Sequence, residues 1–294
     1  MNFSRMDLAD CTKPETLLTA IHSLQKGVFP IPIPVEEWAR ALDITAIEPL
    51  ETEGFEGGLM MFADRSSGTI LVNRNSGDRR RRFTIGHELG HFLLPWHSPR
   101  NGQAFLCSKA DMGVFSAKPG GDRYIEMEAE ANRFSAGLLM PPALFRADLR
   151  ARRNFEVSHI VELADRYDVS KEAAARRCVD LHDEAMAIVV SHDGKVVRIY
   201  RGRDFPYLTI EKNHPLPPQS ITKRTALSQG ESSKWDETPA ELWLQNVRGT
   251  VSEQALGQKD GYRITLLTHE AESLDPEEDE EVEKAWAQPT FRKR

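Results

Sequence analysis

Residues 81–97, RRFTIGHELGHFLLPWH, place histidines and a glutamate in a segment that is otherwise largely apolar. The segment holds three of the nine histidines of the 294-residue chain. Burying imidazoles and a carboxylate among apolar side chains costs free energy unless a partner compensates them. His87 and His91 are four residues apart, so on a helix they share one face and can bind the same metal ion.

Glu88 adds a second chemical function to this segment. It follows the first histidine and is rotated from it by about 100° around the helix axis. Its carboxylate can therefore lie beside a metal ion without binding it, and accept a proton from a water that the metal activates. The pattern is HExxH, here HELGH, which is typical of zinc peptidases. The alternative is a histidine pair satisfied by hydrogen bonds, so a third ligand has to be found.

A catalytic zinc ion needs a third protein ligand and an open position for water. His97 is one candidate, because it stands six residues after His91, as in the pattern HExxHxxGxxH. That pattern has glycine where this chain has Leu94, and glycine adopts the sharp turn more readily. His97 is therefore not expected to bind the metal.

The rival candidate lies in a helix expected over residues 124–140, YIEMEAEANRFSAGLLM. Glu128 and Asn132 lie one turn apart on a single stripe of this helix. Glu128 is predicted to be the third zinc ligand, and Asn132 to hydrogen-bond one of the histidine ligands. Glu126 and Glu130 are expected to face solvent.

Helices and strands are expected around these residues. Residues 14–25 and 35–44 have helical spacing, and the histidine segment reads as a helix that Pro95 stops. Two β-like runs, 57–64 and 68–75, flank an RSSG turn. The second run is expected to offer an edge strand on which an extended substrate can pair.

The remaining segments are a loop, a helical pair and a β region. Residues 98–121 are rich in Gly, Pro, Ser and Lys and are expected to form a long loop that can cover or reshape the cleft. Residues 157–181 read as two helices joined at YDVS, with Ser170 as an N-cap. A hairpin is expected around Asp193-Gly194 and another strand over 262–269. The order of the elements predicts an α+β fold.

The two helical patterns together resemble the ImmA/IrrE family of bacterial, archaeal and phage zinc peptidases. The resemblance is carried by RRFTIGHELGHFLL and EMEAEANRFSAGLLMP, and it spans roughly residues 29–145. It implies a zincin-like metallopeptidase fold with one zinc ion bound by His87, His91 and the residue that matches Glu128. Ser135 departs from the family pattern, where alanine is usual, and residues 98–121 form a long insertion.

Four parts of the chain follow from this assignment. A zincin-like metallopeptidase domain is expected over residues 1–151 and a helix-turn-helix-like segment over 152–183. A C-terminal α/β or β domain is expected over 184–272, and an acidic, disordered tail over 273–294. The acidic run EAESLDPEEDEEVE at 270–283 contributes to the net charge of −7.

Composition indicates the compartment. The contents of 40% hydrophobic and 28% charged residues are ordinary for a globular protein. Neither a signal peptide nor an apolar stretch of about 18 residues is visible, so no membrane partner is expected. Cys11, Cys107 and Cys178 are isolated and lack CxxC spacing, which argues for a reducing compartment and against a thiolate zinc cluster. A cytoplasmic protein is expected.

Two functions are compatible with these patterns. The resemblance implies an endopeptidase that cleaves a helix-turn-helix transcriptional repressor or similar regulator in a stress or mobile-element response. The alternative is a non-proteolytic transcription or stress regulator that uses the same fold to bind protein or DNA. Six basic residues against seven acidic ones in 152–183 disfavour direct DNA binding. Glu88 favours the peptidase, since a site that only binds zinc needs no general base.

Overall fold

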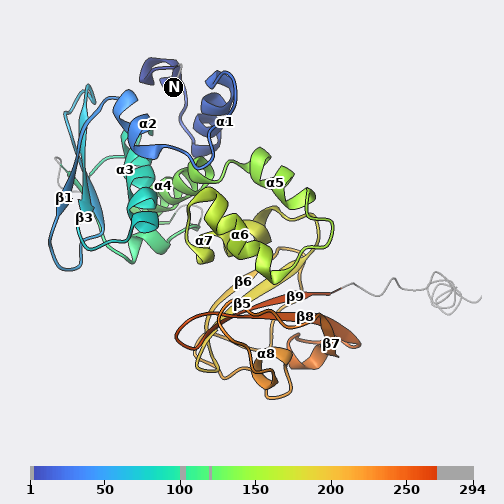
Figure 1. Ribbon diagram of the computed structural model, residues 1–294. Coiled ribbons are helices and arrows are strands. Elements are labelled where there is room, and N and C mark those ends of the chain that lie inside the picture. The colour runs from blue at the N-terminus through green and yellow to red at the C-terminus, as the bar shows by residue number, and fades with distance from the viewer. Residues whose placement is uncertain (1–2, 100–103, 119–120, 270–294) are drawn as a thin grey trace, which may run out of the picture.

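The α+β class predicted from the sequence is confirmed. A computed structural model describes residues 3–99, 104–118 and 121–269, and within these ranges it contains eight α-helices and two sheets (Figure 1). The acidic tail expected over residues 273–294 lies outside the described residues.

The N-terminal sheet has four strands in the order β1-β3-β2-β4. They are β1 (Ile44–Leu50), β2 (Gly57–Met61), β3 (Gly68–Asn73) and β4 (Ala104–Cys107). The expected β2–β3 hairpin is present, and β1 pairs with β3 in parallel. The prediction that residues 68–75 form an edge strand is therefore wrong, because β3 lies between β1 and β2. The edges of this sheet are β1 and β4.

Two further expectations fail in the same sheet. The helix expected over residues 35–44 ends earlier, as α2 (Val35–Ala41), because Asp43 takes a left-handed backbone with φ 71° and the chain continues into β1. The long loop expected over residues 98–121 contains β4, which pairs with β2. It also contains a short 3₁₀ turn at Asp111–Gly113.

Helices pack in layers on this sheet. α3 (Asp78–Leu93) packs on β2 and β3, and α4 (Arg123–Leu139) packs on α3. α3 therefore lies between the sheet and α4 (Figure 1). α1 (Pro14–Leu24) contacts α4 in turn. The layer arrangement brings the histidine helix and the glutamate helix side by side in the protein interior.

Three helices lead out of this first unit. They are α5 (Pro142–Arg150), α6 (Val157–Tyr167) and α7 (Lys171–Leu181). The chain turns between α6 and α7 at Asp168, whose φ is 49°. Ser170 caps α7 as expected, since its Oγ accepts a hydrogen bond from the backbone N–H of Ala173 at 3.1 Å.

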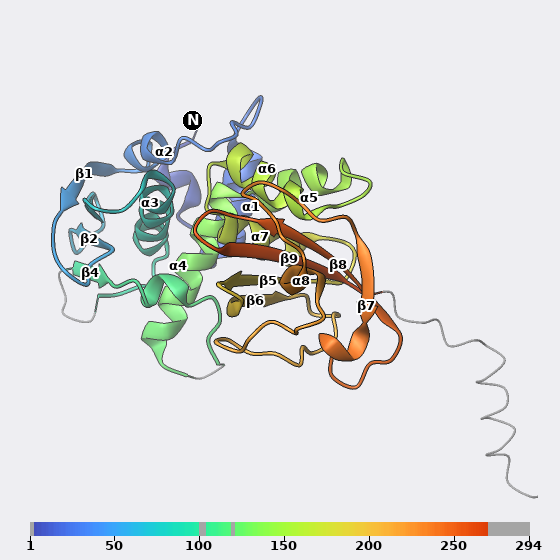
Figure 2. The same ribbon diagram turned by 60° about the horizontal axis from the view of Figure 1, so that its bottom comes forward.

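The C-terminal sheet is antiparallel, with the strand order β6-β5-β9-β8-β7 (Figure 2). Its strands are β5 (Met186–His192), β6 (Lys195–Arg201), β7 (Asp236–Pro239), β8 (Thr250–Gly257) and β9 (Tyr262–Thr268). Asp193 and Gly194 have φ of 48° and 77° in the β5–β6 turn, as the hairpin expected there requires. A short helix, α8 (Ile221–Arg224), packs against β8.

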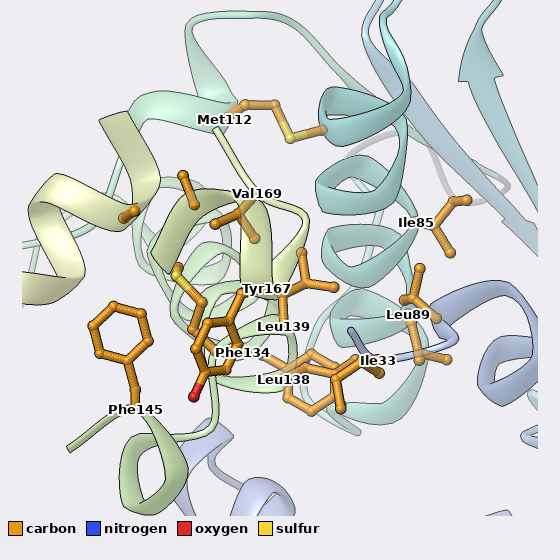
Figure 3. Close-up of a cluster of buried hydrophobic side chains, with 14 of the residues drawn as sticks. Ile33, Ile85, Leu89, Met112, Phe134, Leu138, Leu139, Phe145, Tyr167 and Val169 are labelled. Carbon is orange, nitrogen blue, oxygen red and sulfur yellow. The ribbon is translucent and has the colours of Figure 1, made fainter. Parts of the chain in front are cut away.

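One hydrophobic core runs through both units. It joins side chains of α1, α3 and α4 to those of α6 and α7, and continues to Met186, Ile188, Leu256 and Leu266 of the C-terminal sheet. Figure 3 shows Leu138 and Leu139 of α4 near Tyr167 and Val169 on one side of α3, and Ile85 and Leu89 of α3 on the other side of that helix. A second cluster, which includes Phe205 and Trp243, covers the other face of that sheet. None of the helices in the described ranges is long and apolar enough to cross a membrane.

Candidate metal centre

Close packing of α3 on α4 forms the site. Small residues allow it: a Cβ on Gly86 would lie 2.6 Å from Ser135 Oγ, and one on Gly90 would lie 3.1 Å from the Phe134 ring. Because the helices approach this closely, side chains of both can meet at one point. His87, Glu88, His91 and Glu128 all have 0% exposure.

Three predicted ligands converge there. The Nε2 atoms of His87 and His91 are 3.0 Å apart. Glu128 Oε2 lies 3.2 Å from His87 Nε2, and Glu128 Oε1 lies 3.4 Å from His91 Nε2. The Sγ atom of Cys107 completes a group whose four ligand atoms all lie within 4.8 Å of one another. Cys107 was not predicted to take part.

The other nitrogen of His87 is held by Asn132, as predicted. Asn132 Nδ2 donates to the backbone carbonyls of Asp111 at 2.7 Å and Val114 at 2.6 Å. These bonds turn Asn132 Oδ1 towards His87 Nδ1, at 2.9 Å. Because an amide oxygen only accepts, His87 carries its proton on Nδ1, and its Nε2 presents a lone pair.

The other nitrogen of His91 is held by a chain that was not predicted. His91 Nδ1 lies 2.9 Å from His97 Nδ1, and His97 Nε2 lies 3.3 Å from Glu130 Oε2. Trp96 Nε1 donates to the same Glu130 oxygen at 3.0 Å. Since the carboxylate accepts, His97 carries its proton on Nε2 and accepts from His91 Nδ1. The Nε2 atom of His91 therefore also presents a lone pair.

This chain corrects the expectation for Glu130. Glu130 was expected to face solvent, but it is only 9% exposed, because Trp96 and His97 fold back over α4. Burial raises its pKa. Burial also lowers the pKa of His97 to about 3, as it does for His91. Glu126 is exposed, as expected.

The donor set fits a metal ion. Two imidazole lone pairs and a carboxylate face one another, an arrangement that repels itself unless a cation lies between them. The Nε2–Nε2 separation of 3.0 Å is close to the ~3.3 Å expected for two nitrogen ligands of a tetrahedral zinc ion.

Glu88 lies beside this donor set in a dry pocket. Neither of its carboxylate oxygens receives a hydrogen bond from the described residues. Burial, with a further contribution from the charge of Glu128, raises the pKa of Glu88 to about 8. Gly57 of β2 faces it so closely that a Cβ there would lie 2.7 Å from Glu88 Oε1. The carboxylate can take up a proton next to the group of metal donors.

Arg65 holds the end of α3 that carries His91. Its Nη1 donates to the backbone carbonyls of His91 at 3.2 Å, Phe92 at 2.9 Å and Leu94 at 2.9 Å, and its Nη2 donates to that of His97. The last carbonyls of a helix lack intrahelical partners, so one guanidinium here satisfies several of them. No sequence pattern predicts this role, because Arg65 lies in the turn between β2 and β3.

Hydrolysis of a peptide bond also needs a hydrogen-bond donor to the reacting carbonyl, and the polar residues around the candidate centre are largely engaged within the chain. Both ring nitrogens of His97 already have partners. Tyr124 lies near Glu128, and burial followed by the charge of Glu128 raises its pKa. The four arginines at the start of α3 form ion pairs within the chain. The pairs are Arg79 with Asp165 and Asp168, Arg80 with Glu56, Arg81 with Glu36, and Arg82 with Asp168.

Comparison with known families gives a match for residues 46–179, to the peptidase M78 family described as the IrrE N-terminal-like domain. The match begins in β1 and ends in α7, so it includes the whole donor set and stops before the C-terminal sheet. Comparison with curated proteins gives no match.

Proposed function

The chain carries an IrrE N-terminal-like peptidase domain, and from this premise we propose that it is a zinc-dependent endopeptidase. The observation that carries the proposal is Glu88. A fully buried carboxylate with no hydrogen bond to the described residues stands beside two histidines and a glutamate that can hold a metal ion. A site that only binds metal has no use for such a group, whereas hydrolysis of a peptide bond needs a base.

Each residue has a definite part in the proposed reaction. His87, His91 and Glu128 hold the ion, and Asn132 and His97 fix the orientation of the two imidazoles. When bound, zinc supplies a Lewis acid that activates water and polarises a peptide carbonyl. Glu88 accepts the proton of the attacking water on its carboxylate and passes it to the leaving amine.

The edge strand β4 offers a place for an extended substrate. Its described neighbour is β2 on one side, and its inner face lies over the site, where the Phe105 ring stacks on His91 with ring centroids 4.4 Å apart. A substrate strand that pairs with the other side of β4 would run past the donor set. β4 thus takes the part that the sequence assigned to residues 68–75.

The substrate we propose is a helix-turn-helix transcriptional repressor or similar regulator, cleaved in a stress or mobile-element response in the cytoplasm. The proposal for the substrate rests on the family resemblance. Direct DNA binding by α7 is disfavoured by contacts within the chain. Arg177 donates to the backbone carbonyl of Met140 at 2.6 Å and 3.1 Å, Arg176 lies 3.9 Å from the centroid of the Phe115 ring, and Lys171 bonds Gln258.

The test compares the wild-type chain with the variant Glu88→Gln, using as substrate a helix-turn-helix repressor chosen by its gene lying next to the gene for this chain. Both proteins should bind about one zinc ion per chain, because the ligands are unchanged. Cleavage should fall at least 100-fold in the variant, within the ~10²–10⁴-fold contribution of a general base. Glu126→Gln, on the exposed side of α4, serves as the control and should cleave normally.

Two outcomes would overturn the proposal. A wild-type chain that binds no zinc would show that His87, His91 and Glu128 do not form a zinc site. A Glu88→Gln variant that regulates its target genes as well as wild type would favour the non-proteolytic regulator, because regulation would then not require hydrolysis.

A further inference from the structure

Cys107 is directed at the candidate metal centre by the register of β4. Along this strand Phe105 and Cys107 are buried, while Leu106 between them is 64% exposed. This alternation turns Phe105 and Cys107 to the face that packs on α3. Phe105 stacks on the His91 ring, and Cys107, two residues on, reaches the donor atoms.

The distances from Cys107 suit a fourth ligand. Its Sγ lies 4.0 Å from His91 Nε2 and 3.8 Å from Glu128 Oε1. On a tetrahedral zinc ion, a sulfur and a nitrogen or oxygen ligand are about 3.6 Å apart. A shift of a few tenths of an ångström therefore brings the sulfur to bonding distance. Cys178 is also fully buried, but within the described part of the chain it joins no such group of donors.

We propose that the Cys107 thiolate is the fourth metal ligand, so that the resting chain has a closed coordination sphere and is partly latent as a peptidase, cleaving only in the fraction of chains whose thiolate has left the metal. The inference about latency rests on the proposed function, whereas the inference about ligation does not. When the metal binds, the S–H bond breaks, a sulfur–metal bond forms, and the proton leaves to solvent. When the thiolate leaves the metal, it takes up a proton and frees one coordination position.

A closed sphere has a direct consequence for catalysis. Structural zinc sites have four protein ligands, whereas catalytic sites have three and keep one position for water or substrate. Cys107 would occupy that position. Cys107 is carried by an edge strand, whereas the other three donors are on α3 and α4, which pack against each other. Displacement of β4 can therefore remove the sulfur and leave the remaining ligands in place.

Cobalt(II) loading of the full-length chain tests the ligation directly. Wild type should show visible cobalt bands of a four-coordinate site and a near-ultraviolet band from thiolate-to-cobalt charge transfer. Cys107→Ala should keep visible bands and lose the charge-transfer band, and its zinc affinity should fall by at least about tenfold. Cys178→Ala, the matched buried cysteine, should keep both features.

X-ray absorption of the zinc-loaded wild-type chain gives a second measurement that needs no variant. It should show one sulfur neighbour at about 2.3 Å together with nitrogen and oxygen neighbours at about 2.0 Å. This result would support ligation by Cys107 even if Cys107→Ala failed to fold, provided that Cys178→Ala gave the same spectrum.

Activity tests latency. Cys107→Ala should cleave the repressor at least about tenfold faster than wild type at saturating zinc. Visible cobalt bands without a charge-transfer band in wild type would overturn the ligand assignment and leave the proposed function intact. Absence of all cobalt bands in wild type would overturn both the assignment of Cys107 as a ligand and the proposed function. Sulfur ligation with unchanged cleavage by Cys107→Ala would overturn the latency alone.

Discussion

At the scale of single residues, the candidate centre depends on hydrogen bonds made away from the metal. Asn132 fixes the tautomer of His87, and the chain from Glu130 through His97 fixes that of His91. Both imidazoles therefore present a lone pair at the same point. Such outer contacts commonly contribute 10- to 100-fold to metal affinity.

Glu130→Ala tests the chain that holds His91. Without the carboxylate, His97 Nε2 and Trp96 Nε1 lose their acceptor, and the proton position of His97 is no longer fixed. We expect zinc affinity, measured by competition with a chelator, to fall about 10- to 100-fold. Glu126→Ala on the exposed side of the same helix is the control. Equal affinities of the two variants would show that His91 does not need this chain.

Gly57→Ala tests the space around Glu88. A Cβ at this position would lie 2.7 Å from Glu88 Oε1 and 2.3 Å from Thr84 Cγ2. Because both contacts are too short, the carboxylate has to move, and cleavage should fall at least about tenfold while zinc content stays the same. Overpacking should also cost about 1–3 kcal/mol of stability. Gly113→Ala is the control, because a Cβ there meets nothing within 4 Å, and it should change neither cleavage nor stability. Unaltered cleavage by Gly57→Ala would contradict the assignment of Glu88 as the general base.

The sequence predicts the meeting of those residues of the candidate centre whose relation is local to a helix. His87, Glu88 and His91 follow from the spacing of one helix, and Glu128 with Asn132 from that of another. The exposure predicted for Glu130 is wrong, and its contact with His97 is not predicted, because that contact requires the chain after α3 to fold back over α4, which no periodicity reports. Cys107 was set aside because cysteine spacing reveals pairs of thiolates, not a single cysteine brought in by a strand.

At the scale of elements, the C-terminal end of α3 has to hold its position for His91 to meet Glu128. Arg65 secures this end through hydrogen bonds to four backbone carbonyls. Its own backbone is left-handed, with φ 55°, which is unfavourable for arginine. The guanidinium contacts therefore have to outweigh a local backbone cost.

Arg65→Ala should destabilise the chain and loosen the metal centre together. Loss of hydrogen bonds from a charged donor costs about 1.5–3 kcal/mol, and fraying of α3 should lower zinc affinity as well. Denaturant unfolding with and without zinc measures both effects. Arg74→Ala removes an arginine from an exposed pair with Glu51 and should cost no more than about 1 kcal/mol. A centre that binds zinc normally in Arg65→Ala would mean that α3 holds its end without this contact.

Elements were predicted where their pattern was long and regular. The helices that became α3, α4, α6 and α7 show a helical period over at least three turns. β1 was not predicted because most of its residues are exposed or half-buried and do not alternate, and β4 because four residues are too few to show a period. These two omissions also led to the wrong edge strand, since pairing order cannot be read from the period of one segment.

At the scale of the whole molecule, the helices α3 and α4 and the C-terminal sheet share one hydrophobic core. The apolar cluster passes from α3 and α4 through α6 and α7 to β5, β8 and β9. A polar contact reinforces the junction, because Gln254 Oε1 of β8 accepts a hydrogen bond from the Val157 N–H at the start of α6, at 2.8 Å. Both groups are buried. Shared burial of this kind couples the unfolding of the two units.

Gln254→Ala should therefore lower the stability of the entire chain. The Val157 N–H would lose its partner in a buried place, at a cost of about 1–3 kcal/mol. We expect a single thermal transition with a Tm lower by about 2–4 °C for each kcal/mol. In the cobalt-loaded variant the visible bands should disappear in the same transition, because α3 and α4 lose their support when β8 leaves α6.

Calorimetry combined with cobalt absorption distinguishes coupled unfolding of the two units from independent unfolding. Gln219→Ala, which removes an exposed glutamine, is the control and should leave Tm unchanged. If the C-terminal sheet of Gln254→Ala melted first while the cobalt bands persisted to the wild-type temperature, the shared core would not couple the two units. A common transition would instead mean that any partner or ligand that stabilises the C-terminal sheet also stabilises the metal centre, since both belong to the same folding equilibrium.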